Sequence, residues 1–259
     1  MHSKDVLATT VIQECVRYVN RATSCQFCAI GESLKANKTI AYKRPSQLAE
    51  VAKAAVELDD VKQMVMTTGT PKTNDRGATV LCYSAQAVTN VVDLPIQAQC
   101  EPPKDDFWFQ RMFDSGVVSL GMHLEAVTEP VRKRIMPGKA SVPLSRYMDA
   151  FSAAVEIFGR GQVSTYILAG LGDTVEDILA MCRKLVAIGV YPFVVPFVPI
   201  AGTPLANHPS PDAQMMHRIF SHLGPMLYEN GITSETVNAG CAKCGACSSL
   251  KSYERAANG

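Results

Sequence analysis

The sequence has no excess of charge of either sign and no long apolar run. Its 259 residues include 25 Lys and Arg against 24 Asp and Glu, and the densest basic stretch is Arg132-Lys133-Arg134. This balance excludes the charge pattern of a nucleic-acid binder and favours a small-molecule substrate. The apolar runs are short, and the opening Met-His-Ser-Lys-Asp lacks the regions of a signal peptide. We expect a cytoplasmic protein that engages neither a membrane nor a nucleic acid.

The sequence also lacks the features of a disulfide framework, although it contains nine cysteines. An odd number of cysteines without an export signal argues against disulfides. Six of the nine form two groups, which favours metal binding: Cys15, Cys25 and Cys28 near the start, and Cys241, Cys244 and Cys247 near the end. We expect the others to be small buried hydrophobes; they are Cys82, Cys100 and Cys182.

Short β-branched or apolar runs alternate with longer segments of helical period as far as about residue 231. The runs predict strands at 5–11, 62–68, 95–100, 117–124, 163–168 and 191–199. The other segments predict helices at 45–59, 77–92, 105–115, 143–159, 174–189 and 212–230. This alternation is typical of a parallel sheet covered by crossover helices. Six units are too few for a closed eight-stranded barrel, so an incomplete barrel or an open doubly wound sheet is expected, with ligands at the carboxyl ends of the strands.

The first cysteine group follows the first predicted strand. Three thiolates are one ligand short of a structural zinc site, whereas a [4Fe-4S] cluster on three cysteines keeps one iron open. A three-cysteine loop in this place, with Phe27 before the last cysteine, resembles the radical S-adenosylmethionine (SAM) superfamily. The usual Cys-x3-Cys-x2-Cys spacing would put the first cysteine at Arg21, so Cys15 is expected to replace it. Zinc sites shared with the C-terminal cysteines are the alternative.

Two later strand ends extend the resemblance. Thr68-Gly69-Thr70-Pro71 is similar to the Gly-Gly-Glu-Pro segment that receives the SAM amino group, although it lacks the acid. An ordinary Gly-x-Pro turn is the alternative. His123-Leu124-Glu125 is similar to the pair whose acid binds the SAM ribose in biotin-synthase-like enzymes, and strand periodicity would point His123 and Glu125 the same way. For His123 the alternative is a hydrogen-bonded interior histidine.

Three further segments resemble SAM-binding stretches of the superfamily. The stretch around Met136-Pro137-Gly138 implies that Arg134 meets the SAM carboxylate or a substrate acid, with a solvated basic face as the alternative. The stretch Gly170-Leu-Gly-Asp-Thr-Val-Glu-Asp implies that Gly170 lies near adenine or sugar. The stretch Pro199-Ile200-Ala-Gly-Thr-Pro-Leu implies that Pro199 and Ile200 help to close the SAM pocket.

The C-terminal run Cys241-x2-Cys244-x2-Cys247 resembles a ferredoxin-type motif and predicts a second Fe-S cluster. A zinc knuckle or a structural clip is the alternative. An electron relay, a substrate anchor and a sulfur donor all stay open as roles.

The resemblance covers about residues 5–250 and is nearest to an uncharacterised bacterial branch from nitrilase-containing gene clusters, in the biotin-synthase-like neighbourhood. It implies an α/β fold, with a partial (β/α)6 TIM-like barrel over residues 1–231 and a cysteine-rich extension over 232–259. It also implies an enzyme that reductively cleaves SAM at a [4Fe-4S] cluster on Cys15, Cys25 and Cys28. The resulting 5′-deoxyadenosyl radical would abstract hydrogen from a small organic substrate, with rearrangement and sulfur insertion as candidate outcomes. A flavodoxin or ferredoxin would donate the electron. A non-catalytic iron-sulfur or zinc protein, for electron transfer or scaffolding, is the alternative.

Overall fold

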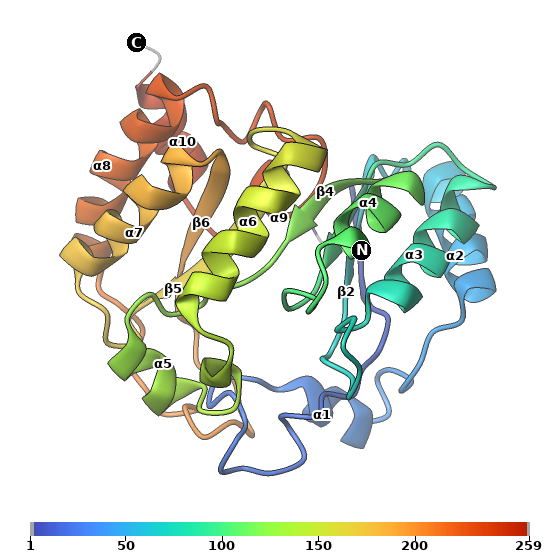
Figure 1. The fold of residues 1–259 in the computed structure, drawn as a ribbon, viewed down its shortest axis with the longest axis horizontal. Coiled ribbons are helices and arrows are strands. Elements are labelled where there is room, and N and C mark those ends of the chain that lie inside the picture. Colours follow the sequence, from blue (N-terminus) through green and yellow to red (C-terminus); the bar gives the residue numbers. More distant parts are fainter. Residues whose placement is uncertain (1–2, 258–259) are drawn as a thin grey trace.

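The computed structural model describes residues 3–257, which form an α/β fold around one parallel sheet of six strands. The strands pair in chain order, as their alternation with helices predicted (Figure 1). They are β1 (Val6–Thr10), β2 (Gln63–Thr67), β3 (Ile96–Gln99), β4 (Val117–Gly121), β5 (Val163–Ala169) and β6 (Val190–Pro196). Within the described chain β1 and β6 are the two edges of this sheet, so the barrel is incomplete.

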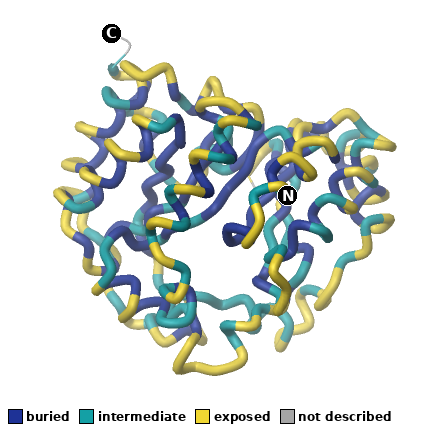
Figure 2. The backbone as a smooth tube through the Cα atoms, in the orientation of Figure 1, coloured by how far each residue is buried: buried dark blue, intermediate teal, exposed yellow. Residues whose placement is uncertain are grey.

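Six helices follow the strands and cover the outer face of the sheet (Figure 1). They are α2 (Pro45–Asp59), α3 (Ala78–Thr89), α4 (Phe107–Asp114), α6 (Leu144–Phe158), α7 (Val175–Ala187) and α8 (Ala213–Glu229). Each lies within a few residues of its predicted range. The strands and the inner faces of the helices are buried, while the outer faces are exposed (Figure 2). Among residues 3–257, no helix has both the length and the apolar composition needed to cross a membrane.

Five short helical segments were not predicted from the sequence: α1 (Ile30–Lys35), α5 (Glu129–Ile135), the 3-10 turn η1 (Lys139–Ser141), α9 (Cys241–Cys244) and α10 (Leu250–Ala256). Each spans two turns or fewer, which is too short for a clear periodic pattern. Helices of this length are not stable alone and form because tertiary contacts hold them.

Strand β4 is shorter than predicted. It ends at Gly121, so the regular strand predicted through residue 124 is too long. Beyond it, the backbone N–H of Leu124 donates to the Thr165 hydroxyl at 2.9 Å, and Glu125 adopts a left-handed conformation with φ of 58°. The backbone is irregular here but stays paired with β5, because Glu125 forms an isolated parallel bridge with Ile167. Strand β6 likewise ends at Pro196 rather than at residue 199.

The segment after α8 returns to the amino-terminal ends of the strands. The N–H of Gly240 donates to the Gln63 side-chain oxygen at 2.6 Å, and the N–H of Cys241 donates to the Gln97 side-chain oxygen at 3.2 Å. Both glutamines are buried inside the sheet, where an unpaired amide would be costly. The C-terminal segment thus closes one end of the barrel. The domain division at residue 231 stays a prediction, and residues 1, 2, 258 and 259 lie outside the described part.

Substitution of Gly240 can test whether the C-terminal segment closes this end of the barrel. Its φ is 113°, and a Cβ there would lie 2.1 Å from the Gln97 side chain. We expect Gly240→Ala to lower the free energy of unfolding by about 2–3 kcal/mol, because it adds both backbone strain and overpacking. The matched control is Gly231→Ala, which has positive φ but open space and should cost only about 1 kcal/mol. Urea denaturation followed by circular dichroism measures both, and equal losses would contradict the closure.

Candidate functional site

The loop between β1 and α1 is fixed first to the end of β2. The N–H of Val16 donates to the Thr70 carbonyl at 2.8 Å. A Cβ on Gly69 would lie 2.2 Å from the Glu14 carbonyl oxygen, so only glycine permits this close approach. Gly69 therefore lets the backbone next to Cys15 lie directly against the carboxyl end of β2.

The far part of the loop is held by α5 and by a small apolar cluster. The N–H of Gln26 donates to the Ile135 carbonyl at 2.8 Å. Cys25 and Phe27 pack against the cluster, whose buried members are Ala126, Val131, Ile135, Met136, Leu171 and Phe197. Both halves of the loop are therefore positioned by elements distant in the sequence.

Cys15, Cys25 and Cys28 line one cavity of about 210 Å³ at the carboxyl ends of the strands, which we call the loop cavity. The same cavity is lined by six other residues predicted from the sequence: Phe27, Thr68, Gly69, Thr70, His123 and Glu125. The fold thus surrounds a single space with the cysteine loop and two predicted strand ends.

Four of the residues predicted to bind SAM lie outside the loop cavity. Arg134 is on the exposed side of α5 and donates to the Leu171 carbonyl at 2.8 Å. Gly170 has φ of 99° and approaches Pro211, so it shapes the turn after β5. Ile200 lines a neighbouring cavity, and Pro199 precedes it in the same loop. Arg134 points away because α5 buries its opposite face.

Two ion pairs line the loop cavity, and three of their residues, Arg17, Glu101 and Lys139, were not predicted as site residues. The Arg17 guanidinium makes two contacts of 2.7 Å with the Glu101 carboxylate, and the Lys139 ammonium lies 2.5 Å from Glu125. The Thr70 hydroxyl donates to Glu101 at 3.0 Å. Glu101 thus places a carboxylate beside the segment that lacks an acid in sequence. The one signal for it was its position directly after β3.

The ion pairs keep both signs of charge in the cavity. Burial alone would raise the pKa of Glu101, but the guanidinium of Arg17 and the ammonium of Lys139 hold it below its ordinary value. Burial would likewise lower the pKa of Lys139, and the Glu125 carboxylate reverses this and raises it. The pairs Arg17–Glu101 and Lys139–Glu125 therefore face one small space.

His123 is neutral in this setting. Burial, helped by the charge of Lys139, lowers the pKa of the imidazole to about 3. Its Nδ1 accepts the backbone N–H of Tyr166 at 3.2 Å, so the ring proton is assigned to Nε2. His123 therefore adds no positive charge to the cavity.

Three cysteines line the loop cavity, which is the donor set of a [4Fe-4S] cluster with one open iron, whereas a structural zinc site takes four ligands. Burial raises the pKa of the Cys25 and Cys28 thiols, so ionising them calls for a bound cationic centre.

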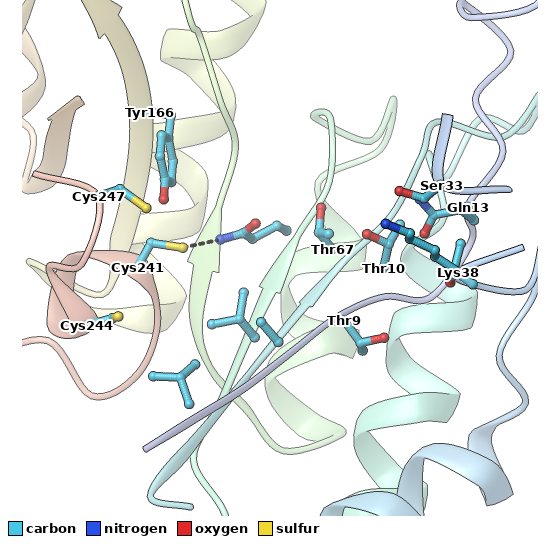
Figure 3. A pocket seen from close by; sticks show the side chains of 15 residues that line it. Thr9, Thr10, Gln13, Ser33, Lys38, Thr67, Tyr166, Cys241, Cys244 and Cys247 are labelled. Carbon is cyan, nitrogen blue, oxygen red and sulfur yellow. Dashed lines mark hydrogen bonds between the residues drawn. The ribbon is translucent and has the colours of Figure 1, made fainter. Parts of the chain in front are cut away.

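The C-terminal cysteines line a second cavity, of about 410 Å³, which we call the inner cavity. Cys241 and Cys244 are three residues apart on α9, and a left-handed turn at Gly245 brings Cys247 back toward them. The sulfurs of Cys241 and Cys247 lie near the hydroxyl end of Tyr166, and Cys244 lies farther from it (Figure 3). The Gln99 amide donates to the Cys241 sulfur at 3.3 Å. Burial raises the pKa of Cys241, while Tyr166 and Gln99 oppose this by hydrogen bonding.

A third cavity, of about 630 Å³, runs along the end of β6, and we call it the apolar cavity. Gln99 lines all three cavities, and Tyr166 and Cys247 line both the inner and the apolar one. His123 and Glu125 line both the loop and the apolar cavity. The three are therefore neighbouring parts of one chamber inside the barrel, with a cysteine group at each end.

The family model of the radical SAM superfamily matches residues 20–185. Bacteriochlorophyllide c C-7(1)-hydroxylase of Chlorobaculum limnaeum is 27% identical over 216 residues, covering 76% of this chain and 54% of that protein. Methylornithine synthase (PylB) superposes with a TM-score of 0.64 at 16% identity, over 88% of this chain and 63% of that one. The hydrogenase maturase HydG from Carboxydothermus hydrogenoformans gives 0.63 at 15% identity, over 86% and 50%. The chain thus spans about half the length of the hydroxylase.

His123 makes stability depend on pH. Between pH 6.5 and about 3 the unfolded chain binds the imidazole proton and the folded chain does not. The free energy of unfolding should therefore fall as the pH drops below 6.5. We expect His123→Gln to lose less stability than the wild type between pH 6.5 and pH 5, in urea titrations at each pH. Exposed His217→Gln is the control and should follow the wild type, and parallel curves for all three proteins would contradict a buried neutral His123.

Proposed function

This chain belongs to the radical SAM superfamily, a superfamily of enzymes, and we propose that it cleaves SAM beside a [4Fe-4S] cluster held by Cys15, Cys25 and Cys28. One observation carries the proposal: these three cysteines line one cavity with Gly69, Thr70, His123 and Glu125 at the carboxyl ends of the strands. Parallel βα folds place their catalytic groups at this edge.

The bound cofactors would supply reductive cleavage of the SAM sulfonium bond to methionine and a 5′-deoxyadenosyl radical, which then takes hydrogen from a small organic substrate. The protein's part is to hold the thiolates, exclude water and orient SAM. The apolar cluster behind Cys25 and Phe27 would hold the loop in place and exclude water from the thiolates.

The charges of the loop cavity suit the amino-acid end of SAM. That end carries an ammonium and a carboxylate, and the cavity offers Glu101 and Glu125 to the first, and Arg17 and Lys139 to the second. Existing ion pairs would exchange partners with the ligand, which costs less than desolvating an unpaired charge. A neutral His123 would not repel the cationic sulfonium.

We assign the adenosine end to the boundary between the loop and apolar cavities. Phe27 and Glu125 line both, and Ile200 lines the apolar cavity. In this proposed adenosine site Thr68 contributes to the wall on the β2 side. Gly170 and Pro199 shape the loops around the site. Arg134 is left out of the proposed site, because it is bound to the Leu171 carbonyl on the surface.

We also propose that Cys241, Cys244 and Cys247 hold a second Fe-S cluster, supported by the hydrogen bonds that Gln99 and Tyr166 direct at the Cys241 sulfur. An external flavodoxin or ferredoxin would supply electrons in the cytoplasm, where thiols stay reduced. The stretch from Pro199 to Leu205 supports placement in the biotin-synthase-like branch, near the family from nitrilase-containing gene clusters.

Anaerobic reconstitution with iron and sulfide, followed by dithionite and SAM, should yield 5′-deoxyadenosine. We expect Cys15→Ala, Cys25→Ala and Cys28→Ala each to lower the rate by about 100-fold or more, beyond the 10–100-fold typical of losing a supporting residue. Chromatography of the nucleoside products and iron analysis provide the readout. Cys82→Ala is the control, since Cys82 lines none of the three cavities. An iron-loaded wild type that never forms 5′-deoxyadenosine would instead support an electron-transfer or scaffolding protein.

Replacing Cys241, Cys244 and Cys247 together by alanine should remove about half of the bound iron if both sites hold four-iron clusters. Formation of 5′-deoxyadenosine should stay within about tenfold of the wild type, because the SAM site does not use these residues. Iron and sulfide analysis with electron paramagnetic resonance separates the two clusters. Unchanged iron content would argue that these cysteines hold no iron, and a matching circular dichroism spectrum checks that the variant is folded.

A further inference from the structure

We propose that the inner and apolar cavities together bind a small organic carboxylate as substrate. Lys38 would hold its anionic group, and its apolar part would lie along the end of β6. This substrate class rests on the proposed function, because it places the substrate in the chamber next to the SAM site.

Lys38 is an exposed cation at the wall of the inner cavity, and it has no ion-pair partner among residues 3–257. Its side chain extends into the cavity from the side opposite the C-terminal cysteines (Figure 3). No Asp or Glu between residues 3 and 257 lines this cavity. Lys35, one turn earlier, is 2.8 Å from Glu32, whereas no ion pair of the described chain includes Lys38. A concave surface with one unpaired ammonium attracts an anion.

The groups around Lys38 favour a carboxylate over a phosphate. Hydroxyls of Thr9, Thr10, Ser33 and Thr39 line the same wall and can donate to anionic oxygens. Phosphate sites typically add a guanidinium fork or the N-terminus of a long helix, and neither lines this cavity in the described chain. A single ammonium with hydroxyl donors matches a single negative charge.

The apolar cavity adjoins the inner cavity on the side of the C-terminal cysteines, where Gln99, Tyr166 and Cys247 line both. Its β6 side is formed by Val195, Phe197, Val198 and Ile200, and Val198 remains 64% exposed at the mouth. Among the residues described, its one charged lining side chain is Glu125, which Lys139 neutralises. The volumes of about 410 and 630 Å³ fall in the range of small-molecule pockets. The chamber therefore fits a molecule with one anionic end and an apolar body.

Isothermal titration of the reconstituted protein with sodium hexanoate tests the substrate class. Hexanoate should bind with a dissociation constant of roughly 1 mM, as expected for a ligand of this size. Hexanamide and hexan-1-ol should bind at least about tenfold more weakly, because they lack the charge that Lys38 recognises. Lys38→Met should weaken hexanoate binding about tenfold, and Lys38→Arg should restore most of it. Lys35→Met, on the same segment, should bind like the wild type.

Three results would overturn the proposal: equal binding of hexanoate and hexanamide, unchanged binding by Lys38→Met, or loss of C-terminal iron in Lys38→Met. The last would mean that Lys38 balances the charge of the metal centre instead. Iron content and circular dichroism of each variant are therefore measured alongside. Formation of 5′-deoxyadenosine is assayed separately, so a wrong substrate class is distinguishable from a wrong assignment of SAM cleavage.

Discussion

Buried polar side chains on the inner face of the sheet impose the constraint on which the chamber depends. Leaving an interior amide or hydroxyl without a hydrogen bond costs about 1–3 kcal/mol. Gln63, Gln97 and Ser119 find their partners in the backbone of residues 239–241. The same bonds fix Cys241 inside the barrel. The requirement to satisfy buried polar groups thus explains why a cysteine-rich segment lies within the fold rather than beside it.

At the opposite end of the chamber, close backbone packing fixes the loop that carries Cys15, Cys25 and Cys28. Gly69 lets the cysteine loop lie against β2, and the apolar cluster behind Cys25 holds its far side. The two cysteine groups consequently face one chamber, separated by the side chains of Gln99, His123 and Tyr166. Because β1 and β6 are edges of the sheet within residues 3–257, the chamber is open on the side where the exposed Lys38 lies.

The two ends of the chamber differ in charge, and this difference would favour a different ligand at each end. The loop cavity holds two ion pairs, Arg17–Glu101 and Lys139–Glu125, which suits a zwitterion. The inner cavity has one ammonium and no carboxylate among the residues described, which suits an anion. Between them His123 stays neutral because burial disfavours its charged form. A cationic sulfonium and an anionic substrate would thus each meet a compatible surface.

The sequence alone determined the six strands, the six main helices and the grouping of the cysteines, because periodicity and motif spacing are local. It could not determine where β4 ends, since that depends on Leu124 meeting Thr165 across the sheet. It also missed the buried pair of Arg17 and Glu101, which are 84 residues apart. The tertiary structure alone placed the C-terminal cysteines in the chamber, through contacts such as that of Gly240 with Gln63 over 177 residues. Such contacts leave no periodic trace, because they join side chains and backbone that only the closed fold brings together.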